Sequence, residues 1–235
     1  MSDRIAVINT SSKIPDDVVD FAVIAINDQL FEMAELWKIP PMPLIFAASD
    51  RGLPPGSTIL LGINDTISQA GVAGYHSNFG GIRYGEILAN DPIATMLTLG
   101  HEAGETQVDS TADQWEGDYA KEVDDPVQED SYQASPAPKI DNETRPQLLP
   151  NYVLPNYFDP DGAFPFDRMQ KLKEPLSMTR GGYQIKRSAT GNVYLVFAKD
   201  ENGRDIEAPA LAAKMARPHS RLMRRLQGRP WVMAA

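Results

Sequence analysis

Residues 101–105 have the types and the spacing of a metal site on a helix. The sequence there is His-Glu-Ala-Gly-Glu, so the imidazole of His101 and the carboxylate of Glu105 stand four positions apart. Residues at this spacing share a helix face, so both side chains could bind one metal ion. Glu102 would then be the base that takes a proton from a water molecule activated by the metal. This pattern is typical of a metal-dependent hydrolase.

The segment differs from the better-known zinc motif, which has a second histidine where this chain has Glu105. Catalytic zinc commonly has three protein ligands and one open position, so a third ligand must come from elsewhere. Asp109 continues the same helix face by one more turn, and the acidic segment beyond it offers Glu122, Asp124 and Asp125. We expect Glu122 or Asp125, rather than Asp109, to complete the site.

Composition limits the metals and ligands. The chain has no cysteine, which excludes disulfides and thiolate ligands and leaves His, Asp and Glu. Zinc is the first expectation, but one histidine with two carboxylates binds zinc less selectively than two histidines and also suits calcium or manganese. The structural alternative is that Glu105 and Asp109 are solvated acids on a helix face and that His101 is a hydrogen-bonded histidine beneath a sheet.

Two further histidines have weaker claims. His76 follows Tyr75 and could line the cleft and donate a hydrogen bond to a developing oxyanion, although a histidine in a strand is more often a packed side chain. His219 lies among arginines, so we expect it to be solvated.

Apolar periodicity predicts two helices. Apolar residues at three-to-four spacing predict a long amphipathic helix over residues 16–37, which prolines then end. Asn90-Asp91-Pro92 offers an N-cap followed by a proline at the first helical position, which predicts a second helix over residues 93–109. The second half of this helix carries the metal-type motif.

Short apolar runs at 44–48 and 58–63, bounded by Gly, Pro and Asp, predict strands. Residues 74–88 contain a glycine-rich turn between β-compatible runs, which predicts a hairpin or an exposed edge strand. A second hairpin is predicted around Thr190-Gly191-Asn192. The chain between 110 and 150 is acidic and rich in proline, so we expect a long irregular loop there.

The charges are unevenly distributed. Residues 102–130 carry eleven acids against Lys121 alone, which equals the whole net charge of -10. Residues 210–229 predict a basic helix or arm with six cations: Lys214, Arg217, Arg221, Arg224, Arg225 and Arg229. Such an arm could contact nucleic acid phosphates at residues 214–229, but without interleaved aromatic residues it more often docks on an acidic protein surface or stays solvated.

The chain is long enough for one domain with extensions. We expect a core over residues 1–130, an extended loop and hairpin segment over 131–209 packed on that core, and the basic arm over 210–235. The first residues show no leader pattern and no stretch reaches the length of a membrane span, so we expect synthesis in a cytoplasm and no membrane contact.

The order of these parts resembles the zincin-like metallopeptidases encoded by bacteriophages and prophages. The likeness is carried by Gly74-Tyr75-His76, by His101-Glu102-x-x-Glu105-x-x-x-Asp109 and by Glu122-Val123-Asp124-Asp125-Pro126-Val127. Later segments at 151–158, 166–169 and 181–183 look similar too, so the resemblance covers residues 15–198. The chain departs from the pattern at Ala103-Gly104, where similar sequences have bulky apolar residues. A glycine inside a helix costs about 1 kcal/mol relative to alanine, so we expect the helix to be bent or closely packed there.

The resemblance implies an α+β, zincin-like fold: a twisted mixed sheet with a backing helix and an active-site helix, and a peptide substrate lying along the edge strand. It implies that His101 is a ligand, Glu102 the base and Glu105 a ligand. Two functions remain open. One is a virion-associated, metal-dependent peptidase; the other is a non-catalytic structural or assembly protein of a phage head, neck or tail, which binds other phage proteins through the acidic loop and the basic arm. The protein is then expected in the host cytoplasm during synthesis and in the virion afterwards.

Overall fold

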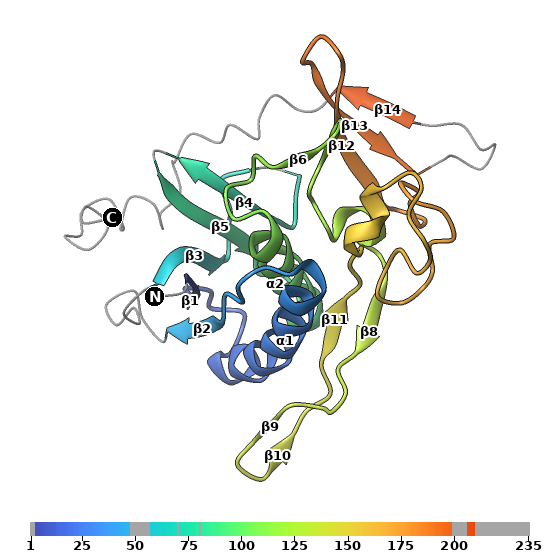
Figure 1. Ribbon diagram of the computed structural model, residues 1–235. Coiled ribbons are helices and arrows are strands. Elements are labelled where there is room, and N and C mark those ends of the chain that lie inside the picture. Colours follow the sequence, from blue (N-terminus) through green and yellow to red (C-terminus); the bar gives the residue numbers. More distant parts are fainter. Residues whose placement is uncertain (1–2, 48–56, 70, 80, 199–205, 210–235) are drawn as a thin grey trace.

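The computed structural model describes residues 3–47, 57–69, 71–79, 81–198 and 206–209 (Figure 1). Within these ranges it combines two α-helices with several small and large sheets, so the expected α+β class is confirmed. In chain order the elements are β1 (Arg4–Asn9), α1 (Asp16–Trp37), β2 (Leu44–Ala47), β3 (Ser57–Asn64), β4 (Gly74–Phe79), β5 (Ile82–Leu88), α2 (Pro92–Val108), β6 (Trp115–Glu116), β7 (Tyr119–Ala120), η1 (Asp125–Val127), β8 (Ser131–Gln133), β9 (Lys139–Ile140), β10 (Glu143–Thr144), β11 (Leu148–Pro150), η2 (Pro155–Phe158), β12 (Tyr183–Arg187), β13 (Val193–Phe197) and β14 (Ile206–Pro209).

The main sheet has the strand order β2-β1-β3-β5-β4. Its first four strands are parallel, whereas β4 runs antiparallel to β5 at the edge, so the predicted hairpin of residues 74–88 is confirmed. The strand β1 was not predicted, although its run Ile5-Ala6-Val7-Ile8 is fully apolar and at most 1% exposed. A short apolar run without alternation is typical of a strand covered on both faces, and this one lies inside the sheet.

The helix α1 follows the predicted bounds and covers one face of the sheet. Its apolar stripe, including Val19, Ile26, Leu30 and Met33, packs with strand residues such as Leu61 in the larger of two core clusters. Burying each such side chain contributes roughly 1.5–3 kcal/mol, so this stripe fixes the helix to the sheet. The helix stops where Lys38 adopts a left-handed conformation and the prolines begin.

The helix α2 begins as the sequence predicts. Asp91 is the N-cap and accepts a hydrogen bond from the Ala94 amide at 3.0 Å, with Pro92 in the first turn. The helix lies close against the edge strand β4 because Gly74 has no side chain: a Cβ there would stand 2.7 Å from Glu102 Oε1. This close approach brings the motif-bearing half of α2 beside β4.

Residues 110–150 do not form the long irregular loop that the sequence suggested. They contain the antiparallel pairs β6–β7 and β9–β10, the strand β8 that pairs with β11, and the short helix η1. Backbone hydrogen bonds hold the acidic part in place, among them Val153 N to Val123 O and Val127 N to Asp124 O. Val123 and Val127 have no exposed surface, so packing against the core overrides the polar composition of this segment.

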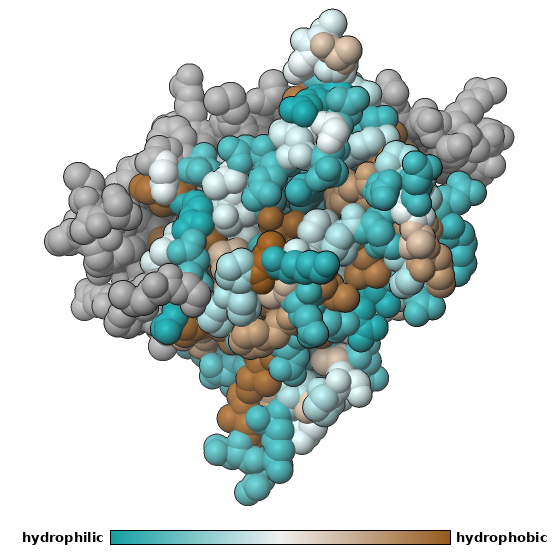
Figure 2. Space-filling model, in the orientation of Figure 1, coloured by the Kyte–Doolittle hydropathy of each residue, from teal (hydrophilic) through white to brown (hydrophobic). Residues whose placement is uncertain are grey.

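A second sheet has the order β14-β13-β12-β7-β6 and contains the predicted hairpin of β12 and β13. Figure 1 shows the β9–β10 hairpin projecting from the body beyond β8 and β11. On the face drawn in Figure 2, hydrophilic residues predominate and apolar ones form scattered patches. In the described part of the chain, no helix is both long and apolar enough to cross a membrane. The predicted basic arm and His219 lie outside the described residues.

Candidate metal centre

Three elements that are far apart in the sequence meet at one buried place. The helix α2 contributes His101, Glu102 and Glu105, the edge strand β4 contributes His76, and the segment leading into η1 contributes further carboxylates. We call this group the metal centre; its members are His76, His101, Glu102, Glu105, Glu122, Asp124 and Asp125. It contains all the predicted site residues except Asp109.

One part of the metal centre contains His101, Glu105 and Asp125. His101 Nε2 lies 3.1 Å from Glu105 Oε1, as the four-residue spacing on one helix face requires, and 3.2 Å from Asp125 Oδ1. One potential ligand atom from each of the three residues lies within 4.8 Å of the other two. The three side chains are thus close enough to bind a single cation.

The other part contains His76, Glu102 and Glu105. His76 Nδ1 lies 3.3 Å from Glu102 Oε2 and 3.4 Å from Glu105 Oε2, and these residues form a second group of potential ligands within 4.8 Å. His76 Nε2 faces Glu122 Oε2 at 3.7 Å. The edge strand therefore supplies an imidazole to the acids of α2, whereas His76 was expected to line the cleft and donate a hydrogen bond to an oxyanion, or to be a packed side chain.

Asp109 has a different role. Its carboxylate accepts backbone hydrogen bonds from Thr111, Asp113 and Gln114, at distances of 2.8 to 3.3 Å. It lies in neither group of potential ligands in the described structure. Asp109 thus shapes the turn that follows α2, because the backbone amides of that turn require acceptors.

Asp124 is a member of the metal centre to which the sequence analysis gave no preference. Its side chain has no exposed surface, and neither carboxylate oxygen has a hydrogen-bond partner among the described residues. Asp124 Oδ2 lies only 2.6 Å from where a Cβ at Gly104 would stand. The glycine in α2 is therefore explained by close packing, and the helix continues past it to Val108.

Tyr183, at the start of β12, was not among the predicted site residues, but its side chain reaches the metal centre. Burial raises the pKa of Tyr183 well above its ordinary value, and so do the charge of Asp125 and the hydrogen bond between the two side chains. The neighbouring Gly182 permits this contact, because any side chain there would collide with the Pro126 carbonyl. The hydroxyl donates a hydrogen bond to the carboxylate and thereby orients Asp125.

The pKa shifts in the metal centre follow from the shared burial of acids and imidazoles. Burial alone would lower the pKa of His76 and of His101, but Glu122 acts on the first and Glu105 on the second to hold both well above 6.5. The two imidazoles in turn hold the pKa of Glu105 well below 4.5, against the effect of burial. The central position of Glu105 between both histidines explains why this carboxylate stays ionised.

The pKa values of two other acids of the metal centre shift upward instead. Burial raises the pKa of Glu102, and the hydrogen bond to His76 offsets this only in part. Burial also raises the pKa of Asp124 well above 3.8, helped by the neighbouring charges of Glu105 and Asp125. Five carboxylates share the metal centre with only two imidazoles, so an excess of negative charge is buried, and buried charges are costly unless they are paired or bind metals.

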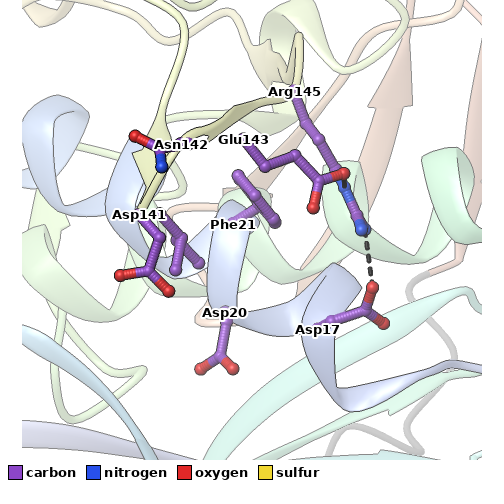
Figure 3. Close-up of a pocket in the computed structure, with 8 residues that line it drawn as sticks. Asp17, Asp20, Phe21, Asp141, Asn142, Glu143 and Arg145 are labelled. Carbon is purple, nitrogen blue, oxygen red and sulfur yellow. Dashed lines mark hydrogen bonds and ion pairs between the residues drawn. The ribbon is translucent and has the colours of Figure 1, made fainter.

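A second acid-rich region lies at the surface and takes no part in this chemistry. We call it the α1 hollow; it is a cavity of about 610 Å³ lined by Asp17, Asp20, Phe21, Ile140, Asp141, Asn142, Glu143 and Arg145 (Figure 3). Arg145 forms ion pairs with Asp17 at 2.8 Å and with Glu143 at 2.7 Å, and its guanidinium lies over the Phe21 ring. The described residues of the α1 hollow include no histidine and no buried carboxylate.

Comparisons of the sequence with protein-family models and with curated proteins, and of the structure with solved structures, found no match.

Proposed function

We propose that this protein is a metal-dependent hydrolase of peptide or other amide bonds, with zinc held by His101, Glu105 and Asp125 on a zincin-like scaffold. The observation that carries the proposal is the buried place where α2 meets η1, at which these three side chains lie within 4.8 Å of one another. One imidazole and two carboxylates are three protein ligands, which leave a fourth position open for water. Glu102, which is not one of these ligands, lies beside them. Calcium or manganese is a less favoured occupant, since His101 provides a nitrogen ligand.

The sheet supports the zincin interpretation. The strand β4 is antiparallel at the end of an otherwise parallel sheet, and α2 lies directly against it while α1 backs the same face. Among the described strands, β4 pairs on one side only, which suits the addition of an extended peptide as a further strand. A peptide bound there would pass His76 and reach the metal centre.

The residues around the cation have distinct roles in the proposed reaction. A divalent cation here would supply Lewis acidity, which activates water near neutral pH and polarises a carbonyl group. Glu102 accepts a proton from the attacking water and delivers it to the leaving amine. The raised pKa of Glu102, caused by burial, suits both steps, because a base is most effective when its pKa approaches the working pH. The hydrogen bond from His76 to the oxyanion, which the sequence suggested, stays a prediction.

Replacing Glu102 tests the proposed function. Glu102→Gln keeps the size and the hydrogen-bonding capacity of the side chain but removes the base. We expect it to lower kcat on a cleaved peptide by roughly a hundredfold to ten-thousandfold while the fold and the bound metal persist. Cleavage would be followed by mass spectrometry of a peptide library. Glu116→Gln, at a residue whose side chain is 55% exposed, is the matched control and should leave the rate unchanged. A normal rate in Glu102→Gln would overturn the role of Glu102.

A second candidate function is assembly of a phage particle. The projecting β9–β10 hairpin favours it, because a hairpin beyond the body offers a surface that a neighbouring protein could grip (Figure 1). In this case the fold would act as a scaffold and any metal would be structural. Deleting the hairpin tip should then block incorporation into purified particles and leave metal binding intact. Normal incorporation of the deletion variant would remove this candidate.

A further inference from the structure

Glu105 faces both histidines of the metal centre with different atoms. Its Oε1 lies 3.1 Å from His101 Nε2, and its Oε2 lies 3.4 Å from His76 Nδ1. The two groups of potential ligands have Glu105 in common, and the two histidines face opposite oxygens of its carboxylate. A carboxylate placed in this way can bridge two metal ions, and bridged ions in co-catalytic sites stand about 3.5–4 Å apart.

We propose that the metal centre binds two divalent cations bridged by Glu105, the first with His101 and Asp125 and the second with His76 and Glu102. The inference rests on the proposed function for its first cation and adds a second. Each cation would have one imidazole nitrogen and two carboxylate oxygens. Mixed ligands of this kind suit zinc best and manganese next, whereas calcium prefers oxygen ligands alone.

The charges of the metal centre favour two cations over one. With all five carboxylates ionised and both imidazoles neutral, a single divalent cation would leave three negative charges uncompensated, and two cations would leave one. Burial makes each uncompensated charge costly: Glu102, Glu105 and Asp124 are at most 4% exposed. A second cation removes most of this cost, and it does so at the position where Glu102 and His76 already approach each other.

Asp124 gives independent support. Both of its oxygens lack a hydrogen-bond partner among the described residues although the side chain is fully buried, which is rare for a carboxylate in a folded protein. It packs against Gly104, which precedes Glu105 in α2. Its carboxylate interacts electrostatically with His101 and with the neighbouring acids Glu105 and Asp125. An acid kept in this position without a protein partner points to a cationic ligand in the metal centre.

The second cation has a consequence for the proposed reaction. When the second position fills, the Glu102 carboxylate becomes a ligand and is no longer available as a base. Hydrolysis that uses Glu102 as the base is therefore a property of the singly loaded form, and excess metal should inhibit it. The second cation position thus makes the rate of hydrolysis at the first position depend on the metal concentration.

Metal stoichiometry on the full chain tests the inference. The protein is stripped with chelator, and Zn²⁺ is titrated by isothermal calorimetry, with the bound metal counted by plasma mass spectrometry. We expect two equivalents in the wild type and in the control Glu116→Gln, and one equivalent in His101→Ala and in His76→Ala. His76→Gln, which keeps a polar side chain there, should also bind one and guards against a folding defect. A single wild-type equivalent would overturn the second cation but spare the proposed function; no bound metal would overturn both.

Electron paramagnetic resonance of the protein loaded with Mn²⁺ tests the shared carboxylate. Two ions bridged by Glu105 are exchange-coupled, so the spectrum of the doubly loaded protein should differ from that of isolated Mn²⁺. His76→Gln should restore the isolated-ion spectrum, because one ion remains. Two bound ions with an uncoupled spectrum would overturn the bridge.

Discussion

The carboxylates of the α1 hollow lie at the surface, whereas those of the metal centre are buried. In the α1 hollow, Asp17 and Glu143 are more than half exposed and share the guanidinium of Arg145. In the metal centre, Glu105 and Asp124 are at most 3% exposed, and the neighbouring carboxylates raise the pKa of both imidazoles. Water and arginine neutralise the first group at little cost, and the second requires either protonated histidines or a cation.

This difference shows that the number of acids in a segment does not identify a metal site. The α1 hollow is an open cavity with abundant carboxylates, yet nothing there forces a cation to bind. The metal centre was suggested by one histidine and one glutamate at helical spacing, and burial then made its charge costly. The following predictions separate the two regions.

The largest expected contrast is in how stability depends on pH with and without metal. The pKa values of His76 and His101 are raised in the folded state, so their stabilisation is complete below 6.5 and is lost as pH rises through the folded values. The raised pKa of Asp124 acts in the same direction. The metal-free protein should therefore lose stability as pH rises above about 6.5.

Zinc should reverse this trend. Metal ligands must be deprotonated, so the stabilisation by metal grows with pH and reaches about 4 kcal/mol at a free metal concentration a thousand times the Kd. Chemical unfolding at several pH values, with chelator and with zinc, measures both curves. Parallel curves in the two conditions would show that the metal centre binds no cation coupled to folding.

The next largest effect is expected from Gly104→Ala. The new Cβ would stand 2.6 Å from Oδ2 of Asp124, whose side chain is fully buried. Overpacking of this kind costs about 1–3 kcal/mol, against a gain of up to about 1 kcal/mol from helix propensity. Chemical unfolding of the metal-free protein checks the sign.

The double variant Gly104→Ala/Asp124→Ala provides the control for this clash. In the Asp124→Ala background the added methyl group no longer meets the carboxylate, so alanine at position 104 should be neutral or stabilising. An equal cost in both backgrounds would mean that Asp124 does not pack against Gly104 as described.

The smallest effect is expected in the α1 hollow. Arg145→Ala removes two surface ion pairs and the contact with the Phe21 ring. Because these groups are solvated, the melting temperature should change less than in Gly104→Ala, and added salt should shrink the difference further. Metal content should stay at the wild-type value. A loss of metal in Arg145→Ala would mean that the two regions are coupled.

Local patterns predicted much of the fold. The bounds of α1 and α2, the N-cap at Asp91 and both hairpins follow from periodicity, capping and turn residues, which act over a few positions. The strand β1 was missed, although its apolar run was visible. The segment 110–150 was misjudged because its order depends on contacts with distant parts of the chain, such as the hydrogen bond from Val153 to Val123.

The candidate site divides in the same way. The proximity of His101 and Glu105 follows from helix geometry alone. The approach of His76 to Glu105 depends on how the sheet pairs β4 with β5. The contact of Asp124 with Gly104 depends on how the segment at η1 packs against β12. Both are long-range contacts that local sequence patterns do not predict. Gly104 was the visible signal of Asp124, since a costly glycine within a helix requires a packing reason.

Metal analysis of protein purified without chelator tests the central claim most directly. Glu105 belongs to both groups of potential ligands, so Glu105→Gln should remove most of the bound metal, while the exposed control Glu116→Gln should keep it. The account predicts stoichiometric zinc in the wild type and in the control, and little in Glu105→Gln. Wild-type protein that is free of metal and fully stable, or equal metal in all three proteins, would contradict it.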